Sequence, residues 1–157
     1  MKIELLTIGK TDQGYLTEGI KVYENRLRHY CNYSRREIPE LKQASSLRES
    51  QIKEREGELV LKQVNDGDTL VLLDERGERV TSEGFSEKLE ALMVRGTKRL
   101  VFLIGGAYGF SDAVYKRADG MISLSAMTFS HQMVRLIFTE QLYRAFTIIK
   151  GEPYHHK

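Results

Sequence analysis

Apolar residues along this chain are spaced alternately with a repeat of two, typical of strands, and a repeat of about 3.6, typical of helices. Strands are predicted at residues 2–8, 35–38, 69–73, 100–104 and 121–124. Helices are predicted at residues 14–30, 47–64, 82–94, 111–118 and 131–149. Strands that alternate with helices form a mostly parallel sheet with helices on both faces. The chain is therefore predicted to be an α/β protein.

Two details of this pattern can be checked at single residues. The run at 100–104 is entirely apolar, which predicts a central strand covered on both faces. Ser82 is the expected N-cap of the helix at 82–94, and Ser111 or Asp112 is expected near the cap of the next helix.

The length of 157 residues fits one domain with a sizeable core. No apolar run approaches the roughly 20 residues that span a bilayer, so no membrane association is expected. The first residues have the pattern of a strand and lack the features of a signal peptide. Cys31 is the only cysteine, which excludes an intrachain disulfide. A cytoplasmic protein is the expectation.

Neither the net charge nor the spacing of the histidines indicates a ligand. The 24 basic and 22 acidic residues leave a net charge of +2, which neither requires nor excludes a nucleic-acid partner. His155 and His156 are adjacent, and adjacent side chains diverge on a regular element, so they lack ligand spacing. No metal site is predicted.

A glycine-rich turn follows the apolar strand at 100–104. Gly105, Gly106 and Gly109 do not match the G-x-G-x-x-G pattern of dinucleotide folds, and the chain has no P-loop. Dinucleotides and nucleoside triphosphates are therefore not expected ligands. Ligands of open α/β sheets bind outside the carboxyl ends of strands, where this turn is predicted to lie. A purely structural turn explains the three glycines equally well.

The segment after the last predicted strand, residues 124–129, is small or apolar with two hydroxyl side chains and no charge. Such a loop can enclose an aromatic ring and bind its edge through main-chain groups. This suits an adenine better than a phosphate, and S-adenosylmethionine is one molecule that fits. A buried core loop is the alternative.

His131 and Arg135 lie four residues apart, which places them on one face at the first turn of the last predicted helix. An imidazole can move a proton near neutral pH, and a guanidinium keeps its charge. The alternative is that His131 merely begins the apolar stripe below it, which comprises Val134, Phe138, Leu142, Ala145 and Ile149.

Several ordered motifs together resemble one family, the large-subunit ribosomal RNA pseudouridine N3-methyltransferases, which are small single-domain members of the SPOUT class. The resemblance rests on LIGGAYGF at 103–110, LSAMTFSHQMVR at 124–135, EQLYRAF at 140–146 and PYH at 153–155. It runs end to end, so residues 1–157 are identified as a single SPOUT methyltransferase domain.

This resemblance implies more than the pattern of strands and helices can. It implies a C-terminal trefoil knot, and a homodimer in which the last helix packs across the two-fold axis. The implied cofactor is S-adenosylmethionine, and the implied partner is 23S rRNA in the ribosome. The implied cofactor contacts are Leu73, Gly105, Leu124, Ser125, Ala126, Met127, Thr128 and Phe129.

The N3 proton of a pseudouridine must be removed before that nitrogen can attack a methyl group. His131 is the predicted proton acceptor, with His155 as its rival, and Arg135 is expected to steady the base or a phosphate. The RNA side is predicted to include Tyr143, Arg144 and Tyr154, with the tail folding over the cofactor. Two other functions stay open: a non-catalytic ribosome- or RNA-binding module of the same fold, and a SPOUT enzyme that modifies another RNA.

Overall fold

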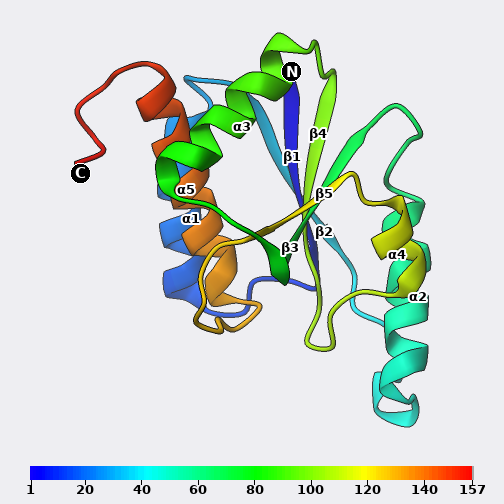
Figure 1. Cartoon of the computed structure of the whole chain (residues 1–157). Coiled ribbons are helices and arrows are strands. Elements are labelled where there is room, and N and C mark those ends of the chain that lie inside the picture. Colours follow the sequence, from blue (N-terminus) through cyan, green and yellow to red (C-terminus); the bar gives the residue numbers. More distant parts are fainter. Residues whose placement is uncertain (157) are drawn as a thin grey trace.

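The computed structural model describes residues 1–156 as helices packed on both faces of one five-stranded sheet (Figure 1). All neighbouring strands are parallel, and their order is β2-β1-β4-β3-β5. The strands are β1 (Lys2–Ile8), β2 (Asn32–Ile38), β3 (Thr69–Arg79), β4 (Arg99–Ile104) and β5 (Gly120–Ser123). The predicted α/β class and the central position of the apolar strand, β4, are confirmed.

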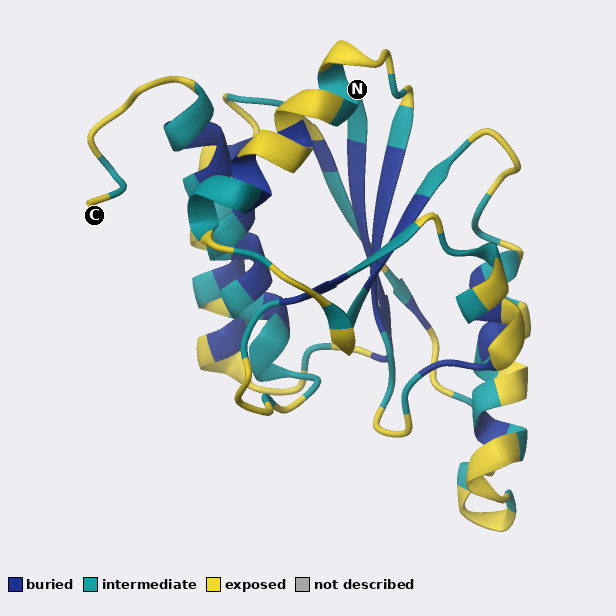
Figure 2. Cartoon of the chain, viewed as in Figure 1, coloured by how far each residue is buried: buried dark blue, intermediate teal, exposed yellow. Residues whose placement is uncertain are grey.

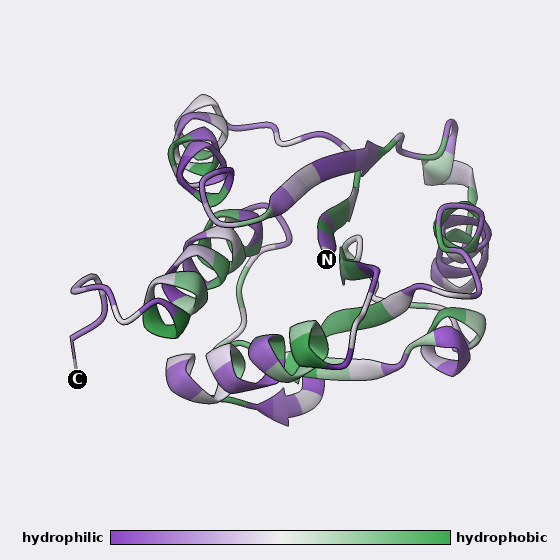
Figure 3. Cartoon of the chain, turned by 90° about the horizontal axis from the view of Figure 1, so that it is seen from above, coloured by the Kyte–Doolittle hydropathy of each residue, from purple (hydrophilic) through white to green (hydrophobic). Residues whose placement is uncertain are grey.

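The helices form one layer on each side of the sheet (Figures 1 and 3). One face is covered by α1, α3 and α5, and the other by α2 and α4. Most turns in Figure 3 show both purple and green, as expected of helices with one buried side. The helices are α1 (Gly14–Leu27), α2 (Glu49–Leu61), α3 (Ser82–Val94), α4 (Asp112–Arg117) and α5 (Met133–Ile149), with a short 3-10 helix at Ala44–Ser46.

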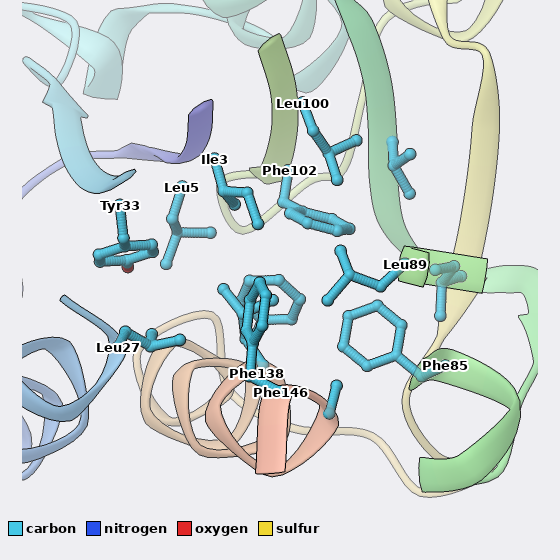
Figure 4. Close-up of a cluster of buried hydrophobic side chains, with 14 of the residues drawn as sticks. Ile3, Leu5, Leu27, Tyr33, Phe85, Leu89, Leu100, Phe102, Phe138 and Phe146 are labelled. Carbon is cyan, nitrogen blue, oxygen red and sulfur yellow. The ribbon is translucent and has the colours of Figure 1, made fainter. Parts of the chain in front are cut away.

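Side chains that alternate along each strand supply a separate core to each helix layer. Leu5 points to the layer of α1, α3 and α5, whereas its neighbour Leu6 points to the layer of α2 and α4. In the first core, the rings of Phe102 and Phe138 lie 4.8 Å apart, and Phe85 packs edge-on against Phe102 (Figure 4). Figure 2 shows the central parts of the strands as buried. Each fully buried side chain of this size contributes about 1.5–3 kcal/mol.

The helix caps confirm one prediction and correct another. Ser111 caps α4, because its hydroxyl accepts a hydrogen bond from the main-chain N–H of Val114 at 3.3 Å. The cap of α3 is Thr81, whose Oγ1 accepts from the N–H of Gly84 at 3.0 Å, so the expectation for Ser82 is wrong. Ser82 is the first helical residue, and its hydroxyl donates to Gln141 in α5 at 2.8 Å.

β3 extends six residues beyond its predicted end at residue 73, because it pairs with β5 twice. Its register shifts between Leu73 and Glu78, after which Glu78 pairs with Ile122. A Cβ atom on Gly77 would lie 2.6 Å from the main-chain nitrogen of Ile122. The two chain segments can pass this closely only because residue 77 has no side chain.

The apolar stripe of α5 packs on the sheet of its own chain. Phe138, Leu142 and Ala145 are fully buried, and they belong to the core formed with β1, β4, α1 and α3. The homodimer and the trefoil knot stay predictions. No helix among residues 1–156 is long and apolar enough to cross a membrane.

Candidate functional site

A cavity of about 810 Å³ lies at the carboxyl ends of β4 and β5, beside the register shift of β3. Leu73 and Ile104 border it from β3 and β4, and Ser123 borders it at the end of β5. Parallel strands that end at one edge of a sheet leave their following loops around a common space. The cavity therefore lies where the sequence predicts a ligand, and we refer to it as the main cavity.

Most of the predicted cofactor contacts surround the main cavity. All of them except Ala126 line it, namely Leu73, Gly105, Leu124, Ser125, Met127, Thr128 and Phe129. Ala126 is exposed within the same loop. Met127 also lines the cavity although 76% of its surface is exposed, so an apolar side chain stands at the rim.

Glycine geometry shapes the turn after β4. Gly106 and Gly109 form an antiparallel bridge, and Gly109 has a φ of +81°, a conformation that side chains other than glycine rarely adopt. A Cβ atom on Gly105 would lie 2.9 Å from the ring of Phe110, so this position also accepts only glycine without a shift. The hairpin therefore presents main-chain groups to the main cavity.

The loop at 124–130 is held by short polar contacts of its own. The hydroxyl of Ser123 donates to the carbonyl of Ser125 at 3.0 Å, and the N–H of Met127 donates to the hydroxyl of Ser125 at 2.9 Å. No charged side chain lies in this loop. Such a wall can enclose an uncharged ring, as the sequence predicts, and it has no positively charged side chain for a phosphate.

Asp74, Arg76 and Tyr115 also line the main cavity, and sequence reasoning missed them as site residues. The hydroxyl of Tyr115 donates to the carboxylate of Asp74, and the guanidinium of Arg76 lies 4.4 Å from the centre of the Tyr115 ring. Burial, and then the hydrogen bond to Asp74, raise the pKa of Tyr115. Asp74 directly follows the end of a predicted strand, and this position could have identified it as a site residue. Tyr115 lies 41 residues away from it and has no such signal.

His131 lines the main cavity, but it precedes α5 instead of lying in its first turn. The hydroxyl of Ser130 accepts from the N–H of Met133 at 3.0 Å, so regular helix begins only at Met133. The predicted helical pairing of His131 with Arg135 is therefore corrected. His131 lies in a turn that leads out of the cavity wall.

Arg135 is completely buried, at 0% exposure, which rules out the predicted contact with a phosphate in this arrangement. Its guanidinium donates to the main-chain carbonyls of Ile8 at 2.7 Å, Gly9 at 2.9 Å and His131 at 3.1 Å. Burial lowers the pKa of Arg135. Since one of its acceptors is the carbonyl of His131, Arg135 positions the backbone of the predicted proton acceptor.

The other predicted site residues lie far from the main cavity. Tyr143 and Arg144 belong to the second half of α5, and Tyr154 and His155 to the tail that follows it. None of the four lines the main cavity. α5 has 17 residues, so about 25 Å separates its two ends. Figure 1 shows the tail leaving at the end of the molecule opposite the loops that follow β4 and β5. The tail therefore does not reach the main cavity of its own chain, and the expectation that a tail folds over the cofactor stays a prediction.

These four residues form a connected group, here called the tail cluster. The rings of Tyr143 and Tyr154 lie 4.7 Å apart, and the guanidinium of Arg144 lies 4.8 Å from the centre of the Tyr154 ring. Arg144 donates to Nδ1 of His155 at 3.3 Å, so the proton of the neutral imidazole is on Nε2, which lies 2.9 Å from Glu83. The two rings meet edge-on, and tyrosine rings beside a guanidinium group are suited to contacts with RNA bases.

Within residues 1–156, no group of three or more histidine, cysteine, aspartate or glutamate side chains is arranged to hold a metal ion. The residues suited to a cofactor are those around the main cavity: the main chain of the glycine hairpin, and the uncharged loop at 124–130. They can hold an uncharged ring and place His131 beside it.

Comparison with known proteins gives consistent matches. A family model described as "Predicted SPOUT methyltransferase" matches residues 1–155. A protein of Christiangramia forsetii named Ribosomal RNA large subunit methyltransferase H is 59% identical over 157 residues, which is 100% of both chains. A protein of the same name from Parabacteroides distasonis is also 59% identical over 100% of both chains. A solved structure of a probable methylase family protein from Haemophilus influenzae Rd KW20 has a TM-score of 0.54 at 11% identity. That match covers 99% of this chain and 70% of the other, and it shows a likeness of fold alone.

Proposed function

The chain belongs to the SPOUT methyltransferase family, and on this basis we propose that it is a methyltransferase of large-subunit ribosomal RNA. The names of its full-length relatives support this substrate class. We further propose that the methyl donor is S-adenosylmethionine and the acceptor is N3 of a pseudouridine in 23S rRNA. The reaction would take place in the cytoplasm, on the large ribosomal subunit.

The observation that carries this proposal is the main cavity at the carboxyl ends of β4 and β5, beside the register shift of β3. Its volume of about 810 Å³ falls within the range of small-molecule sites. The uncharged loop at 124–129 would hold the adenine, and the absence of a side chain on Gly105 lets the Phe110 ring pack against the hairpin that borders the cavity. When bound, S-adenosylmethionine supplies an electrophilic methyl group on a positively charged sulfur.

His131 is the proposed proton acceptor for the N3–H of the target base. It borders the main cavity, and its backbone is held by the buried guanidinium of Arg135. A base that is placed in advance avoids the entropic cost of finding the proton during the reaction. Arg135 is thus a positioning residue, and it does not itself touch the RNA.

The tail cluster can serve the same reaction only if a second copy of the chain is present. Tyr154 and His155 follow the far end of α5, about 25 Å from the start of that helix. We propose a homodimer in which each tail lies over the main cavity of the other copy. Tyr143, Arg144 and Tyr154 would then face the RNA near that cavity, and His155 would remain the rival proton acceptor.

Calorimetric titration with S-adenosylmethionine tests the proposal. The wild-type protein is expected to bind one molecule per chain. Gly105→Ala is expected to weaken binding at least about tenfold, because the new Cβ meets the Phe110 ring and disturbs the cavity wall. Gly14→Ala is the matched control, since a Cβ there meets nothing within 4 Å. Absence of binding by the wild-type protein would leave only a non-catalytic role.

A further inference from the structure

A second cavity of about 310 Å³ adjoins the main cavity and shares one wall with it. The shared wall consists of Gly106, Ala107 and Tyr108 of the hairpin, together with His131. A group bound in one cavity therefore lies next to a group bound in the other. His131, the proposed proton acceptor, borders both.

The second cavity carries two carboxylates, Glu40 from the loop after β2 and Glu56 from α2. The carboxylate oxygens of Glu56 lie 2.9 and 3.0 Å from the position that a Cβ on Gly106 would take. Glu56 therefore lies against the hairpin backbone that forms the shared wall. Any side chain at residue 106 would displace this carboxylate.

Glu56 differs from the other enclosed carboxylates because it has no partner. Glu4 pairs with Arg99, Glu24 with Arg35, and Glu140 accepts from Tyr154. Among residues 1–156, Glu56 makes neither a hydrogen bond nor an ion pair, although it is half-buried. Burial, and then the charge of Glu40, raise its pKa. The carboxylate of Glu56 is therefore available to accept a hydrogen bond from a ligand N–H group.

The chemistry of this cavity selects a particular kind of group. Carboxylates only accept hydrogen bonds and repel phosphate, so the fitting ligand is an uncharged ring with N–H donors. Pseudouridine is attached to its ribose through C5, and its ring therefore presents two N–H groups, at N1 and N3. In uridine, the edge equivalent to N1–H carries a C–H group. Only pseudouridine can donate from both positions.

Building on the proposed function, we propose that the second cavity receives the target base, and that Glu56 accepts the N1–H of pseudouridine and so selects it over uridine. N1 and N3 flank the same ring carbonyl, so the groups that serve them must be close neighbours. His131 and Glu56 meet this condition, because both line the second cavity and only His131 also reaches the main cavity.

The test compares two substrates and three proteins. Large subunits with pseudouridine at the target, and subunits from cells that leave a uridine there, are incubated with wild type, Glu56→Ala and Glu54→Ala. Glu56→Ala is expected to lose about 10- to 100-fold in kcat/KM on pseudouridine, the range for a hydrogen bond to a charged group. Its rate on uridine is expected to stay at the wild-type level, so the preference for pseudouridine collapses. Glu54, which is exposed on the same helix, should change neither rate.

Calorimetry with S-adenosylmethionine accompanies each variant to confirm that the main cavity is intact. If Glu56→Ala fails to bind the donor, it is replaced by Glu56→Gln, which keeps the shape of the side chain. Glu56→Gln is expected to lose less kcat/KM than Glu56→Ala, and only on pseudouridine. Equal losses on both substrates, or an unchanged preference, would overturn the role of Glu56 and leave the proposed function standing. A wild-type protein that methylates neither subunit would overturn both.

Discussion

The guanidinium of Arg135 and the main-chain carbonyl of Ile8 are joined by a buried hydrogen bond of 2.7 Å, which ties the start of α5 to the carboxyl end of β1. The same side chain donates to the carbonyl of His131. The buried guanidinium of Arg135 therefore links the central sheet to the turn that carries His131, the proposed proton acceptor. Its acceptors are main-chain carbonyls and the hydroxyl of Thr11, with no carboxylate among them.

Arg135→Met removes these donors and keeps most of the side-chain volume. The free energy of unfolding is expected to fall by about 3 kcal/mol, because buried carbonyls lose their partners. Urea unfolding followed by circular dichroism measures the change. Arg95→Met, at an exposed position, serves as the control and should alter stability by less than about 0.5 kcal/mol. Equal stability of the two variants would contradict the positioning role of Arg135.

Gly77→Ala tests the close passage of β3 over β5. The new Cβ would lie 2.6 Å from the backbone of Ile122, and a loss of about 2 kcal/mol is expected from this overlap. Gly120→Ala, in β5 itself, meets nothing within 4 Å and should change stability by less than about 1 kcal/mol. Thermal unfolding of both variants under one set of conditions gives the comparison. A harmless Gly77→Ala would mean that the two strands lie farther apart.

Glu56→Gln should stabilise the protein in a manner that depends on pH. Burial and the charge of Glu40 raise the pKa of Glu56 in the folded state, so the folded protein holds this proton more tightly than the unfolded chain. The wild type therefore loses stability as pH rises from the unfolded pKa, about 4.3, through the raised folded pKa. The melting temperature of Glu56→Gln should exceed that of wild type at pH 7.5 and approach it at pH 4. Glu54→Gln, at an exposed position of the same helix, is the matched control. An equal gain of Glu56→Gln at both pH values would argue against the raised pKa of Glu56.

Mixing two inactive variants tests whether the tail acts on a second copy. His131→Ala is expected to bind S-adenosylmethionine normally but not to transfer the methyl group, and a Tyr154→Ala, His155→Ala double variant is expected to be equally inactive. Unfolding and refolding them together at equal amounts makes half of the dimers mixed, each with one intact site. Methyl transfer should return to about a quarter of the wild-type level. No recovery would place each tail at its own cavity or outside the reaction.

The fold was predictable where local pattern and packing agree. The apolar spacing predicts the bounds of β1 and α3 to the residue, because their buried side chains follow the strand and helix repeats. The start of α5 was misplaced by two residues, because the hydroxyl of Ser130 bonds the N–H of Met133 and replaces the first helical turn. β3 was predicted too short, because its last residues pair with β5 beyond a register shift that leaves no trace in hydropathy.

The loops of the candidate site were predictable from the sequence, but the contacts of its charged side chains were not. The residues around the main cavity follow strand ends, and strand ends are visible in the sequence. Arg135 was expected to steady the base or a phosphate. Its burial was not predictable, because a guanidinium is usually exposed and its main-chain acceptors carry no sequence signal. The contact of Glu56 with the hairpin arises only from the packing of α2 beneath the loop after β4, so no spacing rule predicts it.

Transfer of an isotopically labelled methyl group tests the central claim most directly. Purified protein, large ribosomal subunits that lack the modification, and S-adenosylmethionine with a deuterated methyl group are incubated together, and the rRNA is digested to nucleosides for mass spectrometry. One deuterated 3-methylpseudouridine per subunit is expected with wild type, and none with His131→Ala. Label on another nucleoside, or no label with a wild-type protein that binds the donor, would contradict the claim.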